Sequence, residues 1–187
     1  LMSHKKVVFM GTPEFSVPIL EAIAESSYKV SCVYTQAAKK SNRGQKLNIS
    51  PIHKCADNLK LIIRNPKNLN SAEEFEFIKK LNPDIVIVVA YGQIISEKFL
   101  NIPKKGFINI HASLLPKWRG AAPIQRSIMN LDMETGISIM QITKELDAGP
   151  VMKKVKVKIN ETTTTEEILK NLSKIGSDTI VEILDNI

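Results

Sequence analysis

The chain has 187 residues, of which 43% are hydrophobic and 24% charged, and 26 basic against 19 acidic side chains give a net charge of +7. This composition excludes a disordered or fibrous protein, and the length suits one ordinary domain with its own core. The longest apolar run, residues 85–91, is far shorter than the roughly 20 residues of a membrane-spanning helix, so a spanning helix is excluded as well. Two interpretations of the positive charge stay open: affinity for a polyanion such as nucleic acid, or a genomic base bias that favours lysine.

Short apolar segments alternate with amphipathic ones along the chain, which indicates an α/β fold with a mostly parallel sheet and helices on both faces. Strands are predicted over residues 7–10, 30–34, 61–63, 84–90, 106–111, 136–142 and 151–159. Helices are predicted over residues 15–26 and 123–129, and from Ser50-Pro51, Ser71 and Thr164 onward, the last two starting at capping boxes. Residues 36–48 bury almost nothing, so we predict a long exposed loop that is either functional or disordered.

Cys32 and Cys55 show neither a pairing pattern nor the spacing of metal ligands, so we interpret them as reduced packing residues of a cytoplasmic protein. The first six residues run straight into a predicted strand, with no apolar signal region. The chain contains no repeat, low-complexity segment or interdomain linker. We therefore expect one domain over residues 1–187.

Three segments are expected to meet beyond the carboxyl ends of the strands, where ligands of open α/β sheets bind. They are the loop after Ala90, the segment from Asn109 onward and the turn around Asp147. Side chains alternate along a strand, so Asn109 and His111 should point the same way. An amide donor beside an imidazole suits an oxyanion that develops on a carbonyl carbon, and Asp147 can charge the histidine or accept a proton through water.

Each of these residues also has an ordinary structural explanation. An Asn-x-His pair on a strand is more often structural, and an aspartate before Ala148-Gly149 is by default a turn former. The turn at Gly11-Thr12-Pro13 is not a nucleotide-binding turn, because it lacks further glycines and is followed by Glu14. Spacing alone therefore does not establish a catalytic site.

The segment NIHASLLPKWRG at residues 109–120 closely resembles the signature of the folate-dependent formyltransferases. The extension AAPIQR at residues 121–126 resembles the branch of that family that formylates methionyl-tRNA. So do FMGTPEF at 9–15, VAYG at 89–92, TGISIM at 135–140 and ELDAG at 145–149. The resemblance extends from about residue 5 to the C-terminus, and it implies the Rossmann-like formyltransferase fold.

By this resemblance, Asn109, His111 and Asp147 fall on the family's catalytic trio. The implied reaction moves the formyl group of 10-formyltetrahydrofolate, the co-substrate, to the free amine of methionine esterified to initiator tRNA, in support of translation initiation. Asn109 and protonated His111 would stabilise the tetrahedral oxyanion, while Asp147 would keep His111 charged and help to remove the amine's proton. No metal is implied.

The resemblance also implies substrate contacts. Those with folate fall on Ser113, Leu114, Leu115 and Pro116 and on the backbone of Ala90, Tyr91 and Gly92, and those with the tRNA acceptor end on Lys39, Lys40, Arg43 and Lys46. Basic side chains of this kind contact phosphates and position the RNA without reading its sequence. The sequence departs from the family pattern at Ala37-Ala38-Lys39, where relatives start Pro-Asp-Arg, and at Pro150, where an acidic residue is common.

The tRNA branch normally carries a C-terminal β-barrel domain that grips the tRNA, and we expect residues 1–187 to be the catalytic domain without that barrel, in a cytoplasmic monomer with no membrane partner. Two alternatives stay open. One is a formyltransferase that acts on a small amine, such as glycinamide ribonucleotide or an aminosugar, although residues 121–125 and the basic loop argue against it. The other is a catalytically silent module that binds folate or RNA.

Overall fold

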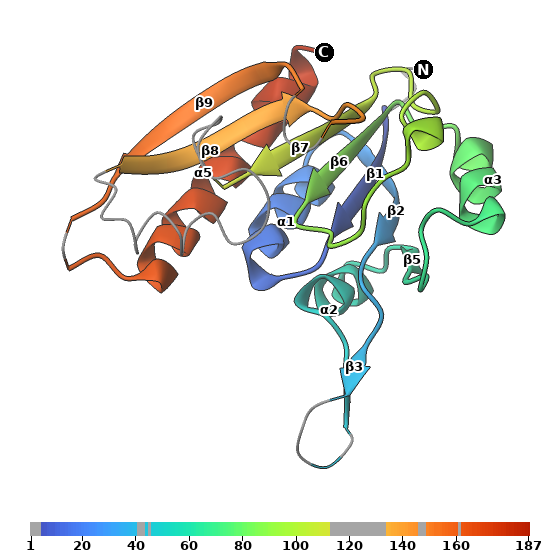
Figure 1. Cartoon of the computed structure of the whole chain (residues 1–187), viewed down its shortest axis with the longest axis horizontal. Helices are drawn as coiled ribbons and strands as arrows, with labels where there is room; N and C mark the ends of the chain where they lie inside the picture. The colour runs from blue at the N-terminus through green and yellow to red at the C-terminus, as the bar shows by residue number, and fades with distance from the viewer. Residues whose placement is uncertain (1–4, 41–43, 45, 113–133, 146–148, 161) are drawn as a thin grey trace.

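A seven-stranded sheet forms the centre of the molecule, with the strand order β5-β2-β1-β6-β7-β8-β9 (Figure 1). The computed structural model describes residues 5–40, 44, 46–112, 134–145, 149–160 and 162–187. The strands are β1 (Lys6–Gly11), β2 (Lys29–Tyr34), β5 (Ile63–Arg64), β6 (Ile85–Val89), β7 (Phe107–His111), β8 (Glu134–Gln141) and β9 (Val151–Lys158). The first five are mutually parallel, and β8 is antiparallel to both of its neighbours, so the predicted mostly parallel sheet is confirmed.

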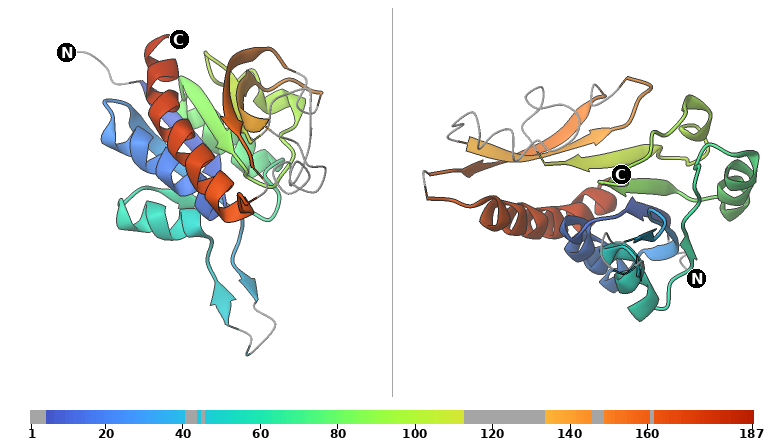
Figure 2. Two further views of the ribbon diagram at one scale, coloured as in Figure 1. Left: turned by 90° about the vertical axis from the view of Figure 1, so that its left-hand side faces the viewer. Right: turned by 60° about the horizontal axis from the view of Figure 1, so that its bottom comes forward.

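Helices cover both faces of the sheet, as predicted (Figure 2). On one face lie α1 (Val17–Glu25), α2 (Pro51–Asn58) and the long α5 (Thr165–Asp185), and on the other lies α3 (Ala72–Leu81). Two 3-10 turns, η1 (Glu14–Ser16) and η2 (Glu97–Phe99), complete the layers. No helix in the described part of the chain is long and apolar enough to cross a bilayer.

The alternation of side chains along the central strands explains why both faces are covered. Val7 and Phe9 of β1 belong to the apolar layer under α1, α2 and α5, whereas Val8 and Met10 belong to the layer under α3 and η2. A strand that is apolar at every position must be covered on both sides to remove that surface from water.

The predicted helix starts are confirmed at three polar caps. The hydroxyls of Ser50, Ser71 and Thr164 accept hydrogen bonds from the backbone N–H groups of residues 53, 74 and 167, at 3.0, 3.3 and 3.1 Å. The box predicted at Ser71 is only half formed, because the Glu74 carboxylate turns to Tyr34 and Arg64 instead. Residues distant in the sequence thus replace the backbone N–H of Ser71 as partners of the Glu74 carboxylate.

Residues 36–48 differ from the predicted loop. We call residues 36–48 the basic arm. Within it two short strands, β3 (Lys39–Lys40) and β4 (Leu47–Asn48), pair antiparallel and form a ribbon that projects from the body of the molecule (Figure 1). The predicted exposure is confirmed at Lys39, Lys40 and Lys46, which are all exposed. The ribbon was not predicted because its strands bury no side chains and so leave no apolar pattern.

The strand predicted at residues 61–63 is a two-residue strand, Ile63–Arg64, displaced toward the C-terminus. The helix predicted over residues 123–129 lies outside the described residues.

Candidate active site

The carboxyl end of β7 carries the predicted Asn109 and His111. Ile108 and Ile110 pack in the layer under α1 and α5, while Phe107 packs in the opposite layer. Since alternate residues of a strand share a face, Asn109 and His111 lie on the side of Phe107, which confirms the predicted common face. His111 is buried, with 8% of its surface exposed, and Asn109 is half-buried. The antiparallel partner of His111 on β8 is the buried Ser138, a neighbour that the sequence did not indicate.

A cavity of about 350 Å³ opens beside Asn109. Its described lining consists of Val88, Gln93, Ile94, Ile95, Asn109, Met140, Gln141, Ile142, Thr143, Lys144, Glu145 and Gly149. Val88 and Met140 are the register partners of Asn109 on β6 and β8, so the floor of the cavity is the sheet itself. The lining is apolar at the floor and polar toward the turn after β8, a distribution typical of small-molecule sites.

The turn after β8 forms one wall of this cavity and is tied closely to the sheet. The N–H of Gln141 donates to the Pro150 carbonyl at 2.9 Å, and that of Ile142 donates to the Phe107 carbonyl at 2.8 Å. A Cβ on Gly149 would lie 1.8 Å from the Gln141 carbonyl oxygen, so only glycine allows this close approach. Asp147 itself lies outside the described residues.

The loop after β6 forms the opposite wall. Ala90 and Gly92 both have positive φ, +52° and +98°, so the chain turns sharply where the strand ends. The Tyr91 carbonyl accepts a hydrogen bond from the Thr12 hydroxyl at 2.7 Å, and the Tyr91 side chain is buried in the apolar layer under α3. Burial raises the pKa of the Tyr91 phenol, whose oxygen has no hydrogen-bond partner among the described residues.

The described cavity lining in this loop comes from Gln93, Ile94 and Ile95, directly after the predicted Ala90-Tyr91-Gly92 segment. The predicted folate contacts of that segment's backbone stay predictions. Ile94 is 83% exposed at the cavity mouth. The signal that could have found Ile94 and Ile95 is an apolar pair in the loop that follows β6, at the edge of the sheet where ligands bind.

Several predicted site residues lie outside the described residues. These are Ser113, Leu114, Leu115 and Pro116, Asp147, and Arg43 of the basic arm. Lys39, Lys40 and Lys46 lie on the basic arm and not in the cavity lining. In the described part of the chain, no group of His, Cys, Asp or Glu side chains is arranged to hold a metal ion.

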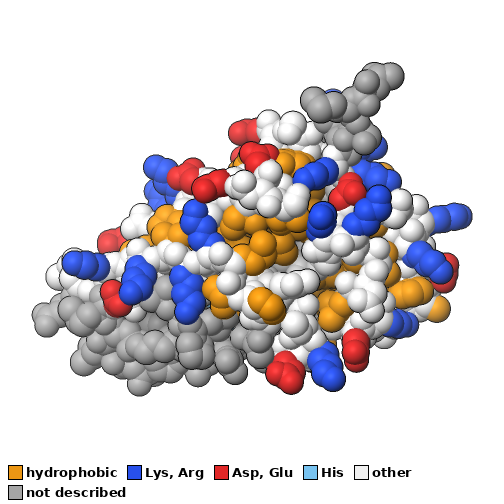
Figure 3. Space-filling view, turned by 90° about the horizontal axis from the view of Figure 1, so that it is seen from above, with side chains coloured by type: hydrophobic (Ala, Val, Ile, Leu, Met, Phe, Trp, Pro, Cys, Tyr) orange, Lys and Arg blue, Asp and Glu red, His pale blue; other side chains and the backbone are white. Residues whose placement is uncertain are grey.

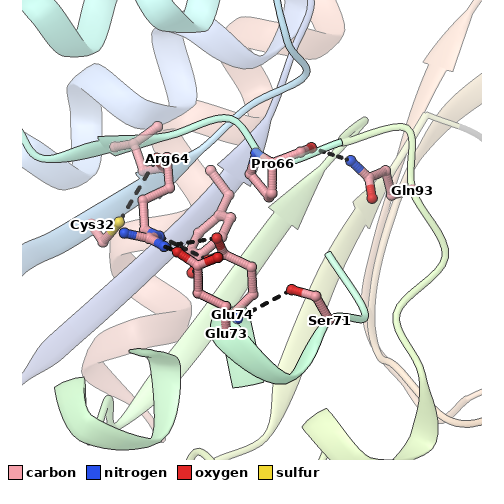
Figure 4. A network of polar contacts seen from close by, with 9 residues as sticks. Cys32, Arg64, Pro66, Ser71, Glu73, Glu74 and Gln93 are labelled. Atoms are coloured by element: carbon pink, nitrogen blue, oxygen red, sulfur yellow. Dashed lines mark hydrogen bonds and ion pairs between the residues drawn. The ribbon is translucent and has the colours of Figure 1, made fainter. Parts of the chain in front are cut away.

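A second polar cluster lies near the carboxyl ends of β2 and β5 (Figure 4). Tyr34 donates to Glu74 Oε2 at 2.6 Å, and Arg64 contacts both oxygens of the same carboxylate. Burial acts to raise the pKa of the Glu74 carboxyl, but the hydrogen bonds from Arg64 and Tyr34 outweigh it and hold this pKa below its usual range. With both carboxylate oxygens engaged, the cluster ties the edge strand β5 to α3 and has no free base to offer for catalysis.

Basic and acidic side chains are mixed on at least one side of the molecular surface. In the view of Figure 3, lysine and arginine side chains are interspersed with acidic ones around exposed apolar side chains. The net charge of +7 therefore does not gather into a single basic patch on that side.

Comparison with known proteins identifies similar sequences and folds. The sequence profile of one family, described as formyl transferase, matches residues 5–184. The chain is 56% identical over 184 residues to the methionyl-tRNA formyltransferase of Pelagibacter ubique, covering 98% of this chain and 59% of that protein. It is 45% identical over 183 residues to the methionyl-tRNA formyltransferase of Ehrlichia ruminantium strain Gardel, covering 97% of this chain and 60% of the relative. The chain thus spans about three fifths of the length of these curated relatives.

Solved structures with the same fold are more distant in sequence. The phosphoribosylglycinamide formyltransferase of Streptococcus pneumoniae superposes with a TM-score of 0.76 at 19% identity, covering 98% of both chains. The glycinamide ribonucleotide transformylase 1 of Symbiobacterium toebii superposes with a TM-score of 0.77 at 18% identity, covering 96% of this chain and 85% of the other. At such low identity, the similarity shows the fold.

Proposed function

The chain belongs to the formyl transferase family, and from that premise we propose that it transfers the formyl group of 10-formyltetrahydrofolate to the free amine of methionyl initiator tRNA. The observation that carries this proposal is the 56% identity to a relative named for that activity. The solved structures, which are named for a ribonucleotide acceptor, are much less similar in sequence. The whole protein would serve translation initiation.

The cavity beside Asn109 is the proposed folate site. Its volume of about 350 Å³ lies in the range of small-molecule pockets. Val88, Met140 and Ile142 offer apolar surface for a flat heteroaromatic ring such as a pterin. The polar residues Gln141, Thr143 and Glu145 also line the cavity and offer hydrogen-bond partners for its polar edge.

Asn109 and His111 are the proposed oxyanion stabilisers. When the amine nitrogen attacks the formyl carbon, a new C–N bond forms and the formyl oxygen takes up negative charge. The Asn109 amide and His111, as an imidazolium, would donate hydrogen bonds to that oxygen, which is the largest single source of rate enhancement in many acyl transfers. The bond from the formyl carbon to the folate nitrogen then breaks; the amine gives up one proton and the folate nitrogen takes one up, so that the formylated amine and tetrahydrofolate are the products.

Asp147 is proposed to keep His111 charged and to help remove that proton through water. The described residues that flank it on either side, Glu145 and Gly149, both line the cavity, which supports this role. Ser113, Leu114, Leu115 and Pro116, and the backbone of Ala90, Tyr91 and Gly92, remain the proposed further folate contacts.

The basic arm is the proposed contact with the acceptor end of the tRNA. Lys39, Lys40 and Lys46 are exposed on a ribbon that projects from the body, and Arg43 belongs to the same segment. Such side chains neutralise phosphates and position an RNA backbone without reading bases.

The test is an acceptor comparison with the full-length protein. It is supplied with 10-formyltetrahydrofolate that carries a labelled formyl group and, in parallel reactions, with methionyl initiator tRNA, glycinamide ribonucleotide or an aminosugar. We expect label in the methionyl-tRNA only. Transfer to a small amine but not to the tRNA would overturn the proposal, and so would binding of folate or RNA with no transfer to any acceptor.

A further inference from the structure

We propose that Gln93 is a positioning residue that holds the base of the basic arm against the cavity wall, so that an RNA bound by the arm presents its acceptor end to the cavity in one orientation. This inference rests on the function proposed above. It concerns a residue that lines the cavity and whose side chain contacts Gln36, the first residue of the arm.

The side-chain amide of Gln93 connects segments that are far apart in the sequence. Its Oε1 accepts a hydrogen bond from the backbone N–H of Leu69 at 2.8 Å. Its Nε2 donates to the Pro66 carbonyl at 3.1 Å, as Figure 4 shows, and to Gln36 Oε1 at 3.2 Å. Both N–H groups are therefore used, one on the segment after β5 and one on the arm.

The base of the arm is held by further contacts to the same region. The Gln36 N–H donates to the Thr12 hydroxyl at 3.3 Å, and that hydroxyl in turn donates to the Tyr91 carbonyl. The Gln36 side chain also packs on Gly92, where a Cβ would lie 2.6 Å from Gln36 Nε2. The segments after β1, β2, β5 and β6 thus meet at the Gln36–Gln93 pair.

Among the described residues beyond the base of the arm, β3 and β4 pair only with each other, and Lys39, Lys40, Leu47 and Asn48 are exposed. A small rotation at Gln36 would therefore be amplified along the ribbon, where the basic side chains lie. Misplacement of a substrate by about 1 Å can cost on the order of a hundredfold in rate, so the rigidity of this base matters for transfer.

The test compares variants that break the Gln36–Gln93 contact with a control variant that changes another contact of the loop after β6. Gln93→Leu removes the link between cavity wall and arm, and Gln36→Leu removes the same link from the other side. Asn70→Leu is the matched control, because Asn70 bonds Ile94 and Ser96 of the same loop at 2.8 and 2.9 Å without contacting the arm. Gln36→Glu keeps an oxygen that can accept from Gln93 Nε2.

Kinetics are measured with the full-length protein, separately for methionyl initiator tRNA and for 10-formyltetrahydrofolate. We expect Gln93→Leu and Gln36→Leu each to lower kcat/KM for the tRNA on the order of tenfold or more, while KM for the folate stays within about twofold. The double variant should lose no more than the more affected single variant, because both substitutions remove one shared contact. Gln36→Glu and Asn70→Leu should behave like the wild type.

The possible outcomes are distinct. Additive losses in the double variant, or an equal loss in Asn70→Leu, would mean a general structural role and overturn the inference. Unchanged tRNA kinetics in Gln93→Leu would overturn it too. If the wild-type protein itself forms no formylmethionyl-tRNA, the proposed function fails, which is a separate result.

Discussion

Arg64 holds the Glu74 carboxylate with two nitrogens, Nε 2.8 Å from Oε2 and Nη2 2.8 Å from Oε1. Tyr34 adds a third donor at 2.6 Å, and the Glu74 side chain is only 6% exposed. The pair joins the short edge strand β5 to α3, and the Arg64 guanidinium also lies 4.0 Å from the centre of the Phe77 ring. The edge of the sheet thus depends on this cluster.

Replacing Glu74 by glutamine is expected to lower the free energy of unfolding by roughly 2–3 kcal/mol, because it leaves a partly buried guanidinium without its closest counter-charge. The loss should stay below that of a fully buried pair, since Arg64 is 25% exposed. Glu73→Gln is the control: Glu73 contacts the same arginine at 3.4 Å but is 82% exposed, so its loss should be under about 1 kcal/mol. Equal losses in urea unfolding would contradict this.

The contribution of Glu74 to the free energy of unfolding should depend on pH. Its carboxyl pKa is lowered in the folded protein, so its stabilisation is complete above the unfolded pKa of about 4.3 and is lost as the pH falls through the folded value. The difference in unfolding free energy between wild type and Glu74→Gln should therefore be constant between neutral pH and about pH 5, and shrink below about pH 4. A difference that instead varied between pH 6 and 8 would point to another group.

Gly92→Ala should destabilise the protein more than Gly44→Ala does. Both glycines have strongly positive φ, +98° and +92°, so alanine carries a similar backbone strain of about 1 kcal/mol at each. Only at Gly92 would the new Cβ also displace Gln36, whereas at Gly44 no atom of the described residues lies within 4 Å of it. Thermal unfolding measures the difference, and equal shifts in Tm would rule out the close packing of Gln36 on Gly92.

The two cysteines should differ in reactivity. Burial raises the pKa of the Cys32 thiol to about 12, and burial together with the charges of Glu21 and Glu14 raises that of Cys55 to about 11. Cys32 is fully buried and Cys55 only half-buried, so an aromatic disulfide reagent at pH 8 should label native Cys55 slowly and Cys32 more slowly still. Cys55→Ser should remove the faster phase, and a native Cys55→Ser variant that reacts at the same rate would refute the order.

The proposed oxyanion donors should be costly to remove. Asn109→Leu and His111→Ala are each expected to lower kcat for formyl transfer by about 10²–10³-fold, as for other oxyanion donors, with a smaller effect on KM. Steady-state kinetics with methionyl initiator tRNA measure this, together with unfolding curves to confirm that each variant folds. Unchanged kcat in a folded His111→Ala variant would remove His111 from the catalytic trio.

Most strands, the helix caps and the common face of Asn109 and His111 were predictable because they depend on neighbours in the sequence. Unbroken apolar residues in β1 and β6 predict burial on both faces, and Ser50, Ser71 and Thr164 cap helices through N–H groups three residues away. The shared face of Asn109 and His111 follows from the two-residue period of a strand. Their proposed action on a formyl group rests on the resemblance, not on the period.

The partners of Glu74 and the Gln36–Gln93 pair were not predictable, because they depend on contacts between segments that are far apart in the sequence. Glu74 was predicted to close a capping box with its carboxylate. In the structure the carboxylate instead accepts hydrogen bonds from Arg64 and Tyr34, because a buried charge is stabilised most by a paired cation. Gln93 and Gln36 are 57 positions apart, and no local pattern marks either of them.

The sequence by itself thus determined which strand carries Asn109 and His111 and which way these side chains point, since both follow from local periodicity. Only the tertiary structure decided which side chains wall the cavity beside them and what holds the basic arm. Those relationships arise where the ends of parallel strands converge at one edge of the sheet, and that convergence depends on the order of the strands.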